Sequence, residues 1–459
     1  MIHRYQKKGL NFVLDVNSGA VHLLDDISYA VSGLLDENMG DTCPQSIVDA
    51  LPDYTADEIR EAYDELYELK KAGQLFAQDD YIDVSRYIPV NAPVKALCLH
   101  VAHDCNLRCK YCFASTGDFG QGRKIMPPEI AKKAIDFVIA RSGVRHNIEV
   151  DFFGGEPLMA WDTVTQTVDY ARSLEEKHNK KFRFTITTNG LLLDEDKRKY
   201  INENMDNCVL SLDGRREVND EFRKTVAGTG SYDTIVPKFK ALVDERDPNL
   251  DYYARGTFTS HNLDFAEDVL SIADAGFDRL SVEPVTADPG CGYDLTEDDL
   301  PKIEAEYDRL TDIMLERKKE GKPFTFFHFM VDLDQGPCVV KRLRGCGAGY
   351  EYVAVTPDGD IYPCHQFVGK EEFKQGSVLD QSFNMDIAQT FAGMNIYSRP
   401  KCQKCWAKFY CSGGCSAANY NMNHDMNDSY DLGCEMERKR LECAIYLKAM
   451  DKICANQSK

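Results

Sequence analysis

Three closely spaced cysteines are the strongest candidates for metal-dependent chemistry in this chain. Cys105, Cys109 and Cys112 form a C-x3-C-x2-C pattern directly after Leu97 to Val101, an apolar run typical of a strand. Three thiolates on one short loop can bind three irons of a [4Fe–4S] cubane and leave the fourth without a protein ligand, where a substrate can chelate. A zinc site and a three-cysteine fragment of a ferredoxin are the alternatives for this loop taken alone.

Further polar motifs follow the next predicted strands. Gly154-Gly155-Glu156-Pro157 comes after the run Ile148 to Phe153, where glycines expose backbone carbonyls and Glu156 supplies negative charge for an ammonium group. Asn189 follows the apolar run Phe182 to Thr188, and Ser211 lies near the end of the run Cys208 to Leu212. Taken alone, such Gly-Gly, Asn-Gly and Asp-Gly steps are ordinary turns.

In this order, the cysteine loop and the later motifs resemble the radical S-adenosylmethionine (SAM) superfamily. The resemblance implies that SAM binds the open iron and that Cys105, Cys109 and Cys112 carry the catalytic cluster. Asn219 to Arg223 is close to the superfamily's H-D-x-x-R, although Asn219 stands where that pattern has histidine. The contacts to SAM implied by the resemblance are Tyr111, Gly154, Gly155, Glu156, Pro157, Asn189, Ser211 and Arg223.

The remaining cysteines point to more soft-metal sites. The chain has 17 cysteines and no recognisable export signal, so we expect reduced thiols rather than a disulfide framework. Eight of them lie between residues 338 and 434, and Cys402-x2-Cys405-x5-Cys411-x3-Cys415 is the densest run. A zinc ribbon would use four of these cysteines and leave the other four unexplained.

The spacing of seven of these cysteines, Cys346 to Cys434, resembles the SPASM extension of radical enzymes that modify peptides and proteins, and Cys338 could supply an eighth ligand. That resemblance implies two auxiliary [4Fe–4S] clusters, and therefore three clusters in the whole chain. It assigns Cys338, Cys346, Cys364 and Cys415 to an inner cluster and Cys402, Cys405, Cys411 and Cys434 to an outer one. If Cys338 is not a ligand, the inner cluster has an open iron that a substrate thiolate could occupy.

The elements that must position these motifs alternate along the chain. From residue 95, six apolar, β-branched runs are separated by helical patterns such as Pro128 to Arg141. Six βα units in series predict an α/β fold with a partial (β/α)6 TIM-type barrel, which places chemistry at the carboxyl ends of its strands. We expect the radical SAM barrel to span residues 95–320 and an iron–sulfur SPASM domain to span residues 335–445.

Residues 1–85 are expected to form a separate winged-helix-like module. A hairpin is predicted from Asn11 to Leu24, followed by helices over Ile27 to Leu35 and Ala56 to Lys71, with Thr55 as a possible N-cap. The module has 17 Asp and Glu against 6 Lys and Arg, a net charge of −11, which disfavours DNA. An edge strand of such a module can instead take up an extended peptide.

The net charge and the hydrophobic pattern of the chain disfavour some classes of partner. A net charge of −21 disfavours nucleic acid and membrane surfaces, and the chain has no run of 18 apolar residues. We expect a cytoplasmic protein. Its length, with 43% hydrophobic residues, allows two or three domains.

The order of the three parts resembles the maturases of ribosomally made peptides, and most closely the SCIFF-type thioether maturases. The resemblance implies a PqqD-like precursor-recognition module that docks the leader of a cysteine-rich peptide, and an electron donor such as flavodoxin or ferredoxin. The expected product is a thioether (sactionine-like) cross-link between a cysteine sulfur and an α, β or γ carbon of another residue. The alternatives are a sulfatase-type maturase that oxidises a Cys or Ser, and a non-catalytic iron–sulfur electron carrier or regulator.

Overall fold

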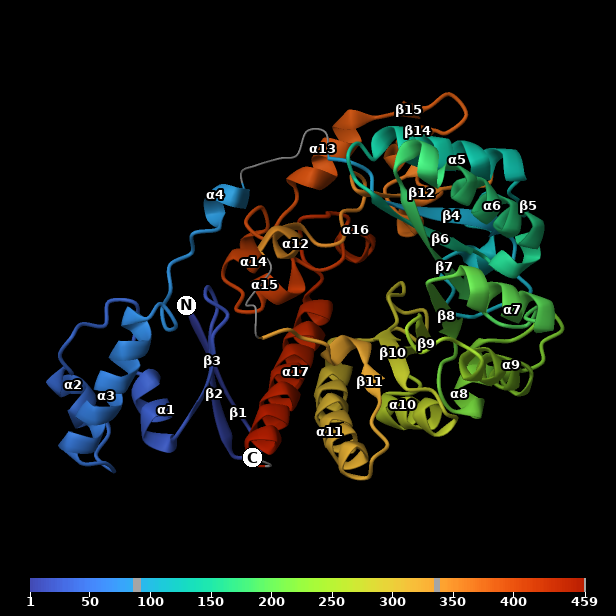
Figure 1. Cartoon of the computed structure of the whole chain (residues 1–459). Coiled ribbons are helices and arrows are strands. Elements are labelled where there is room, and N and C mark those ends of the chain that lie inside the picture. The colour runs from blue at the N-terminus through green and yellow to red at the C-terminus, as the bar shows by residue number, and fades with distance from the viewer. Residues whose placement is uncertain (86–91, 334–338, 458–459) are drawn as a thin grey trace. The chain divides into compact units, whose positions relative to one another are not determined.

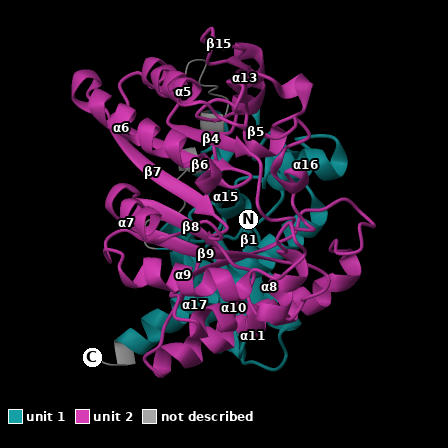
Figure 2. Ribbon diagram, turned by 90° about the vertical axis from the view of Figure 1, so that its right-hand side faces the viewer, with its two compact units in different colours: residues 1–87, 329–345, 394–459 teal, residues 88–328, 346–393 magenta. Residues whose placement is uncertain are grey.

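The computed structural model describes residues 1–85, 92–333 and 339–457. These residues form two compact units, which Figure 2 shows in different colours. Unit 1 contains residues 1–87, 329–345 and 394–459, and unit 2 contains residues 88–328 and 346–393.

Six parallel strands form the centre of unit 2, as the alternating pattern predicts. Neighbouring strands pair in parallel in the order in which they occur along the chain. All eight residues of the first strand are buried, because it lies inside the sheet. The strands are β4 (Ala96–His103), β6 (Asn147–Gly154), β7 (Lys181–Thr188), β8 (Asn207–Ser211), β9 (Asp251–Phe258) and β10 (Arg279–Pro284).

Helices connect these strands and pack along the sheet (Figure 1). The first begins at Pro128, where proline costs no hydrogen bond, and buries Ala131, Ala134, Ile135 and Val138. The helices of unit 2 up to residue 328 are α5 (Pro128–Arg141), α6 (Trp161–His178), α7 (Glu195–Asn204), α8 (Arg216–Phe222), α9 (Tyr232–Asp244), α10 (Phe265–Asp274) and α11 (Leu300–Lys319).

The sheet continues beyond β4 into a later part of the chain. β12 (Tyr352–Val355) pairs in parallel with β4, and β13 (Asp360–Tyr362), β14 (Gly376–Ser377) and β15 (Ser382–Phe383) follow in antiparallel order. The short strands β5 (Lys124–Ile125) and β11 (Thr325–Phe326) pair with β4 and β10, and α13 spans Met385–Gly393. The segment that carries Cys346 and Cys364 is therefore continuous with the parallel sheet.

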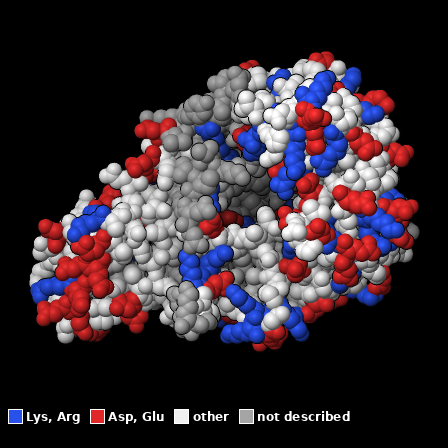
Figure 3. All heavy atoms as spheres, in the orientation of Figure 1, with Lys and Arg blue, Asp and Glu red and all other residues white. Residues whose placement is uncertain are grey.

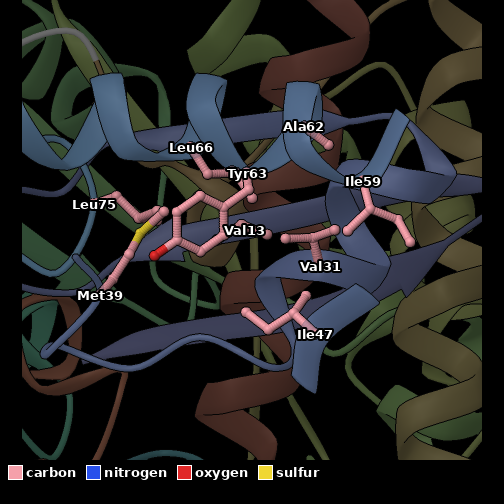
Figure 4. Packing of buried hydrophobic residues seen from close by; sticks show 9 residues of the cluster. All are labelled: Val13, Val31, Met39, Ile47, Ile59, Ala62, Tyr63, Leu66 and Leu75. Atoms are coloured by element: carbon pink, nitrogen blue, oxygen red, sulfur yellow. The ribbon is translucent and has the colours of Figure 1, made fainter. Parts of the chain in front are cut away.

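The amino-terminal part of unit 1 is a three-stranded antiparallel sheet with helices. The hairpin of β2 (Leu10–Asp15) and β3 (Val21–Leu24) occurs where it is predicted, and β1 (Ile2–Lys7) pairs with β2 as an additional strand. Figure 4 shows Val13, Val31, Tyr63 and neighbouring side chains packed between this sheet and its helices. The helices are α1 (Asp26–Ser32), α2 (Gln45–Ala50), α3 (Ala56–Lys71) and α4 (Ile82–Ser85).

A capping box fixes the start of α3. The Thr55 hydroxyl accepts a hydrogen bond from the Glu58 amide, and the Glu58 carboxylate accepts one from the Thr55 amide. Two amide groups that the helix itself leaves without partners are thereby satisfied. The predicted N-cap at Thr55 is present.

The rest of unit 1 is helical and has its own small core. Val16 packs with Leu343, Ile396, Cys402 and Phe409, so the amino-terminal sheet and the late cysteine segment share buried residues. The helices are α12 (Val339–Arg344), α14 (Pro400–Gln403), α15 (Lys408–Cys411), α16 (Ser416–Asn423) and α17 (Asp431–Gln457). None of the helices in the described ranges is both long and apolar enough to cross a membrane.

Candidate active site

A cavity of about 250 Å³ lies in unit 2, at the carboxyl ends of the parallel strands. The structure brings nearly all predicted SAM-site residues to its wall. They come from the loop after β4, from the ends of β6, β7 and β8 and from the residue after α8: Cys105, Cys109, Tyr111, Cys112, Gly154, Gly155, Glu156, Asn189, Ser211 and Arg223. Among the described lining residues Pro157 does not appear; it begins a short 3-10 turn, Pro157–Ala160, and is buried.

The cysteine loop is held by backbone hydrogen bonds to the segment that follows α8. The Arg108 amide donates to the Lys224 carbonyl at 2.7 Å, and the Lys110 amide donates to the Phe222 carbonyl at 3.1 Å. These bonds fix the backbone between the three cysteines. The loop's conformation therefore does not depend on metal–thiolate bonds alone.

Gly154 and Gly155 allow β6 to end against the start of this loop. The Gly155 amide donates to the Ala102 carbonyl at 2.7 Å. A Cβ atom on Gly154, whose φ is +128°, would collide with that same carbonyl oxygen, and one on Gly155 would collide with the Asp104 carbonyl oxygen. Only glycine fits this close approach, so the G-G step fixes the loop as well as exposing backbone.

Glu156, which follows β6, is hydrogen-bonded to residues at the end of β7. Its carboxylate is 1% exposed and accepts hydrogen bonds from the Thr188 hydroxyl at 2.7 Å, the Asn189 amide at 2.8 Å and the Leu158 amide at 3.0 Å. Burial raises the pKa of this carboxyl group. The carboxylate therefore positions Asn189 in addition to placing negative charge at the cavity wall.

Asn189 and Cys105 are in direct contact. The Asn189 side-chain amide donates to Asn106 Oδ1 at 2.8 Å and lies 3.5 Å from the Cys105 sulfur. The Leu107 amide also points at that sulfur, at 3.4 Å. Donors of this kind stabilise a thiolate and tune a cluster bound to it.

Arg223 brings a buried guanidinium group to the wall of the cavity. Its Nη1 donates to the Tyr111 hydroxyl at 3.0 Å, and that hydroxyl donates to Asp213 Oδ2 at 2.5 Å. The guanidinium group is buried, and its Nε has no hydrogen-bond partner in the part of the chain that the structure describes. A buried cation at the wall of the cavity fits the carboxylate of a bound amino acid such as the methionine part of SAM.

The thiols themselves fit a cluster. Burial raises the pKa of Cys105 to about 12 and that of Cys109 to about 11, so the charge of bound iron would be needed to hold them as thiolates at neutral pH. Among the described residues, no three His, Cys, Asp or Glu side chains converge on a position for a single ion. The three cysteines instead border a cavity with room for more than one atom.

Sequence reasoning missed the wall contributed by the later strands. Arg255 on β9 pairs with Glu283 on β10, with Arg255 Nε 3.2 Å from a Glu283 oxygen, and both residues line the cavity with Thr257. Charged side chains inside buried parallel strands are the signal that identifies such residues. His365 also lines the cavity, and burial, followed by the charge of Arg255, lowers its pKa to about 4.

A second cavity, of about 190 Å³, lies in unit 1 and brings together the four cysteines predicted for the outer cluster. Cys402, Cys405 and Cys411 come from α14, α15 and the turn between them, and Cys434 lies in the first turn of α17. Burial raises the pKa of Cys411 to about 12 and that of Cys434 to about 11. Four thiols around one hollow match the ligand set of a fully ligated cubane.

Cations surround these four thiols. Arg438 Nη1 lies 3.9 Å from the Cys405 sulfur, and Lys408 lines the cavity with its side chain 4% exposed. Arg399 is 3% exposed and donates to the Gly413 carbonyl at 2.6 Å, in the turn after Cys411. Positive charge near thiolates compensates the negative charge of a bound cluster.

The residues predicted for the inner cluster are divided between the two units. Cys346 and Cys364 belong to unit 2 and Cys415 to unit 1, while Cys338 lies outside the described residues. This ligand set remains a prediction.

Comparison with known proteins identifies two domains. Residues 99–251 match the model of the radical SAM superfamily, and residues 346–406 match that of an iron–sulfur cluster-binding domain, SPASM. The chain therefore contains a radical SAM domain and a SPASM domain, which imply [4Fe–4S] clusters and SAM as cofactors.

Individual relatives cover most of the chain. A cysteine-type anaerobic sulfatase-maturating enzyme of Clostridium novyi is 25% identical over 72% of this chain and 90% of its own length. The solved structure of anSMEcpe with bound AdoMet covers 80% of this chain and 100% of its own, with a TM-score of 0.64 and 20% identity. The structure of Streptococcus suis SuiB bound to S-adenosylmethionine covers 94% and 98%, with a TM-score of 0.52 and 17% identity. These similarities confirm the predicted fold class, a partial barrel with a carboxyl-terminal iron–sulfur domain.

Proposed function

We propose that this protein is a radical SAM enzyme that installs thioether cross-links between a cysteine sulfur and a carbon of another residue in a ribosomally made precursor peptide. The cavity of unit 2 carries the proposal, because Cys105, Cys109, Cys112 and the buried Arg223 border the same space. A solved SuiB structure also contains its precursor peptide SuiA, which supports a peptide substrate for a chain of this fold.

Each group of the first cavity has a defined task in this reaction. When bound, the cluster and SAM supply a 5′-deoxyadenosyl radical that takes one hydrogen atom from a carbon of the peptide. Cys105, Cys109 and Cys112 would hold three irons of the cluster and leave the fourth without a protein ligand. Arg223 and Asn189, which line the same cavity, would orient the bound SAM.

The net reaction removes two hydrogens from the peptide. One C–H bond and one S–H bond break and one C–S bond forms, so the carbon gives a hydrogen atom to the cofactor and the thiol releases a proton. One electron remains, and Cys402, Cys405, Cys411 and Cys434, which line one cavity, would hold an auxiliary cluster able to accept it. An external donor such as flavodoxin or ferredoxin supplies the electron that starts each turnover.

The amino-terminal sheet is the proposed docking site for the peptide leader. β3 is an edge strand that pairs only with β2 among the described strands, and Leu23 on it is 42% exposed. An extended segment can add to such an edge as a further strand. Exposed acidic residues of α3, seen in red on the left of Figure 3, favour a leader with basic residues: Asp57, Glu58, Glu61, Asp64, Glu65 and Glu68.

The deciding experiment uses the full chain, reconstituted anaerobically and supplied with SAM, a reductant and a cysteine-rich candidate precursor. We expect 5′-deoxyadenosine together with a peptide that has lost two hydrogens per cross-link and whose thiols no longer react with an alkylating agent. Intact clusters that produce no 5′-deoxyadenosine would reject the radical chemistry and support the electron carrier or regulator.

A separate substitution tests the edge strand. If β3 binds the peptide leader, Leu23→Asp should lower the affinity for the peptide. Leu379→Asp, which changes an exposed leucine of unit 2, is the matched control and should not.

A sulfatase-type maturase is the second candidate function. The similarity to the Clostridium novyi enzyme, over most of both chains, favours it. It predicts an aldehyde-type oxidation product at one Cys or Ser and no new link to sulfur. Mass spectrometry of the same reaction therefore separates the two functions.

A further inference from the structure

The amino-terminal module touches the loop that carries the outer cysteines. The ring of His3 stacks on Trp406, with ring centroids 3.7 Å apart and planes 2° from parallel, and His3 Nε2 lies 2.9 Å from a Glu442 oxygen on α17. Trp406 directly follows Cys405. A residue at the start of the chain thus fixes a side chain next to a predicted cluster ligand.

Two further side chains of the module pack on the same loop. Val16 is buried against Cys402 and Phe409, and Tyr81 meets the Phe409 ring edge-on at 5.2 Å. All of these residues belong to unit 1. The packing is apolar and buried, so the module and the ligand loop form a continuous core.

An ion pair connects the module to the wall of the outer cavity. Lys408 Nζ lies 2.7 Å from Asp79 Oδ2, and the Tyr397 hydroxyl donates to the other oxygen of Asp79. The Lys408 side chain is 4% exposed and that of Asp79 is 26% exposed. Removing Asp79 would leave the buried ammonium group of Lys408 without its carboxylate partner.

We propose that the amino-terminal module completes the shell of the outer auxiliary cluster, and that Asp79, by neutralising Lys408, holds the reduction potential of that cluster down. The proposal rests on the assignment of a cluster to Cys402, Cys405, Cys411 and Cys434. A [4Fe–4S] cluster gains one negative charge on reduction, and an uncompensated cation beside it favours the reduced state. The module therefore takes part in electron transfer in addition to docking a peptide.

The test is a redox titration of the full chain, reconstituted anaerobically and followed by electron paramagnetic resonance of the outer cluster. Asp79→Asn leaves Lys408 without its carboxylate, so we expect the potential to rise. Asp80→Asn makes the same charge change at the exposed neighbouring residue and should leave the potential unchanged. Asp79→Glu, which keeps the charge, should behave like the parent protein.

A reciprocal change checks the sign. Lys408→Met leaves Asp79 as the uncompensated charge, so the potential should fall, and the double variant Asp79→Asn with Lys408→Met should return towards the parental value. If Asp79→Asn lost its outer cluster, Lys408→Met and the double variant would carry the test. Equal shifts for Asp79→Asn and Asp80→Asn, or a double variant that does not move back, would overturn the proposal.

A separate measurement tests the assignment on which the proposal rests. Cys402→Ala should lower the iron content of the reconstituted protein and remove one cluster signal. Unchanged iron in Cys402→Ala would reject the cluster assignment itself. If Cys402→Ala lost iron as expected, but the Asp79 and Lys408 substitutions left the reduction potential unchanged, only the role of Asp79 would be rejected.

Discussion

The two cysteine-lined cavities differ in the origin of their thiols and in the groups around them. In unit 2, three cysteines of one loop border about 250 Å³ together with Arg223, whose Nε lacks a partner among the described residues. In unit 1, four cysteines from α14, α15, the turn between them and the start of α17 border about 190 Å³, with Arg438 and Lys408 beside them. Three thiolates with a free donor suit a cluster that binds a small molecule, whereas four thiolates with cations suit one that only exchanges electrons.

The first substitution removes a ligand from the three-cysteine cavity. Cys105→Ala leaves two thiolates on the loop, too few to hold a cubane with a single open iron. SAM cleavage should fall to the background of the reductant alone, measured as 5′-deoxyadenosine released under anaerobic conditions. Cys98→Ala, at a buried cysteine of β4 outside the cavity lining, is the control and should retain cleavage.

The matching substitution in the four-cysteine cavity should separate cleavage from product. Cys411→Ala removes one outer ligand, and we expect SAM cleavage within a few fold of the parent but no peptide cross-link. Iron content, 5′-deoxyadenosine and peptide mass are measured on the same sample. Full product from Cys411→Ala would mean that the outer site is structural, and the contrast between the two cavities would then not be one of function.

Local spacing indicated which cysteines lie together, because Cys105, Cys109 and Cys112, and likewise Cys402, Cys405 and Cys411, are near neighbours in sequence. The parallel strands were predictable for a similar reason, since each apolar run is followed by a helix with its own periodicity. Glu156 shows the limit of this reasoning. Its motif is visible in the sequence, but its bonds to Thr188 and Asn189 depend on which strand lies next to β6.

Features that depend on distant contacts could not be predicted. The polar sequence of β1 does not indicate a strand, yet Tyr5 and Lys7 are buried, and Lys7 reaches the Cys443 sulfur on α17 at 3.4 Å. Likewise β12 joins the barrel sheet only because it pairs with β4, some 250 residues earlier. Such pairings arise from tertiary packing, which outweighs local propensity.

The next substitution tests whether Arg223, the buried cation that lines the first cavity, binds SAM. Arg223→Met removes a charge-assisted hydrogen bond worth about 3 kcal/mol, so the KM for SAM should rise by about 100-fold. Arg223→Lys keeps the charge without the planar donor geometry and should have an intermediate effect. Arg216→Met, at an exposed arginine paired with Asp233, is the control.

An unchanged KM for SAM in Arg223→Met would contradict the statement that Arg223 makes the first cavity a binding site for SAM. Because Arg223 also lies beside the buried Asp213, thermal unfolding of each variant must be measured in parallel. Only a rise in KM at a retained melting temperature supports a contact with SAM.

The smallest expected effect concerns the residue that positions Arg223. Tyr111→Phe removes the hydroxyl that accepts from Arg223 and donates to Asp213, which leaves the guanidinium group free to shift. A hydrogen bond of this kind contributes about 1 kcal/mol, so the KM for SAM should rise about fivefold while kcat changes little. Tyr170→Phe is the matched control, because its hydroxyl also donates to a carboxylate, Asp136, on the outer surface. An effect of Tyr111→Phe that persists in an Arg223→Met background would show that Tyr111 acts on SAM directly, whereas its disappearance there would show that Tyr111 acts through Arg223.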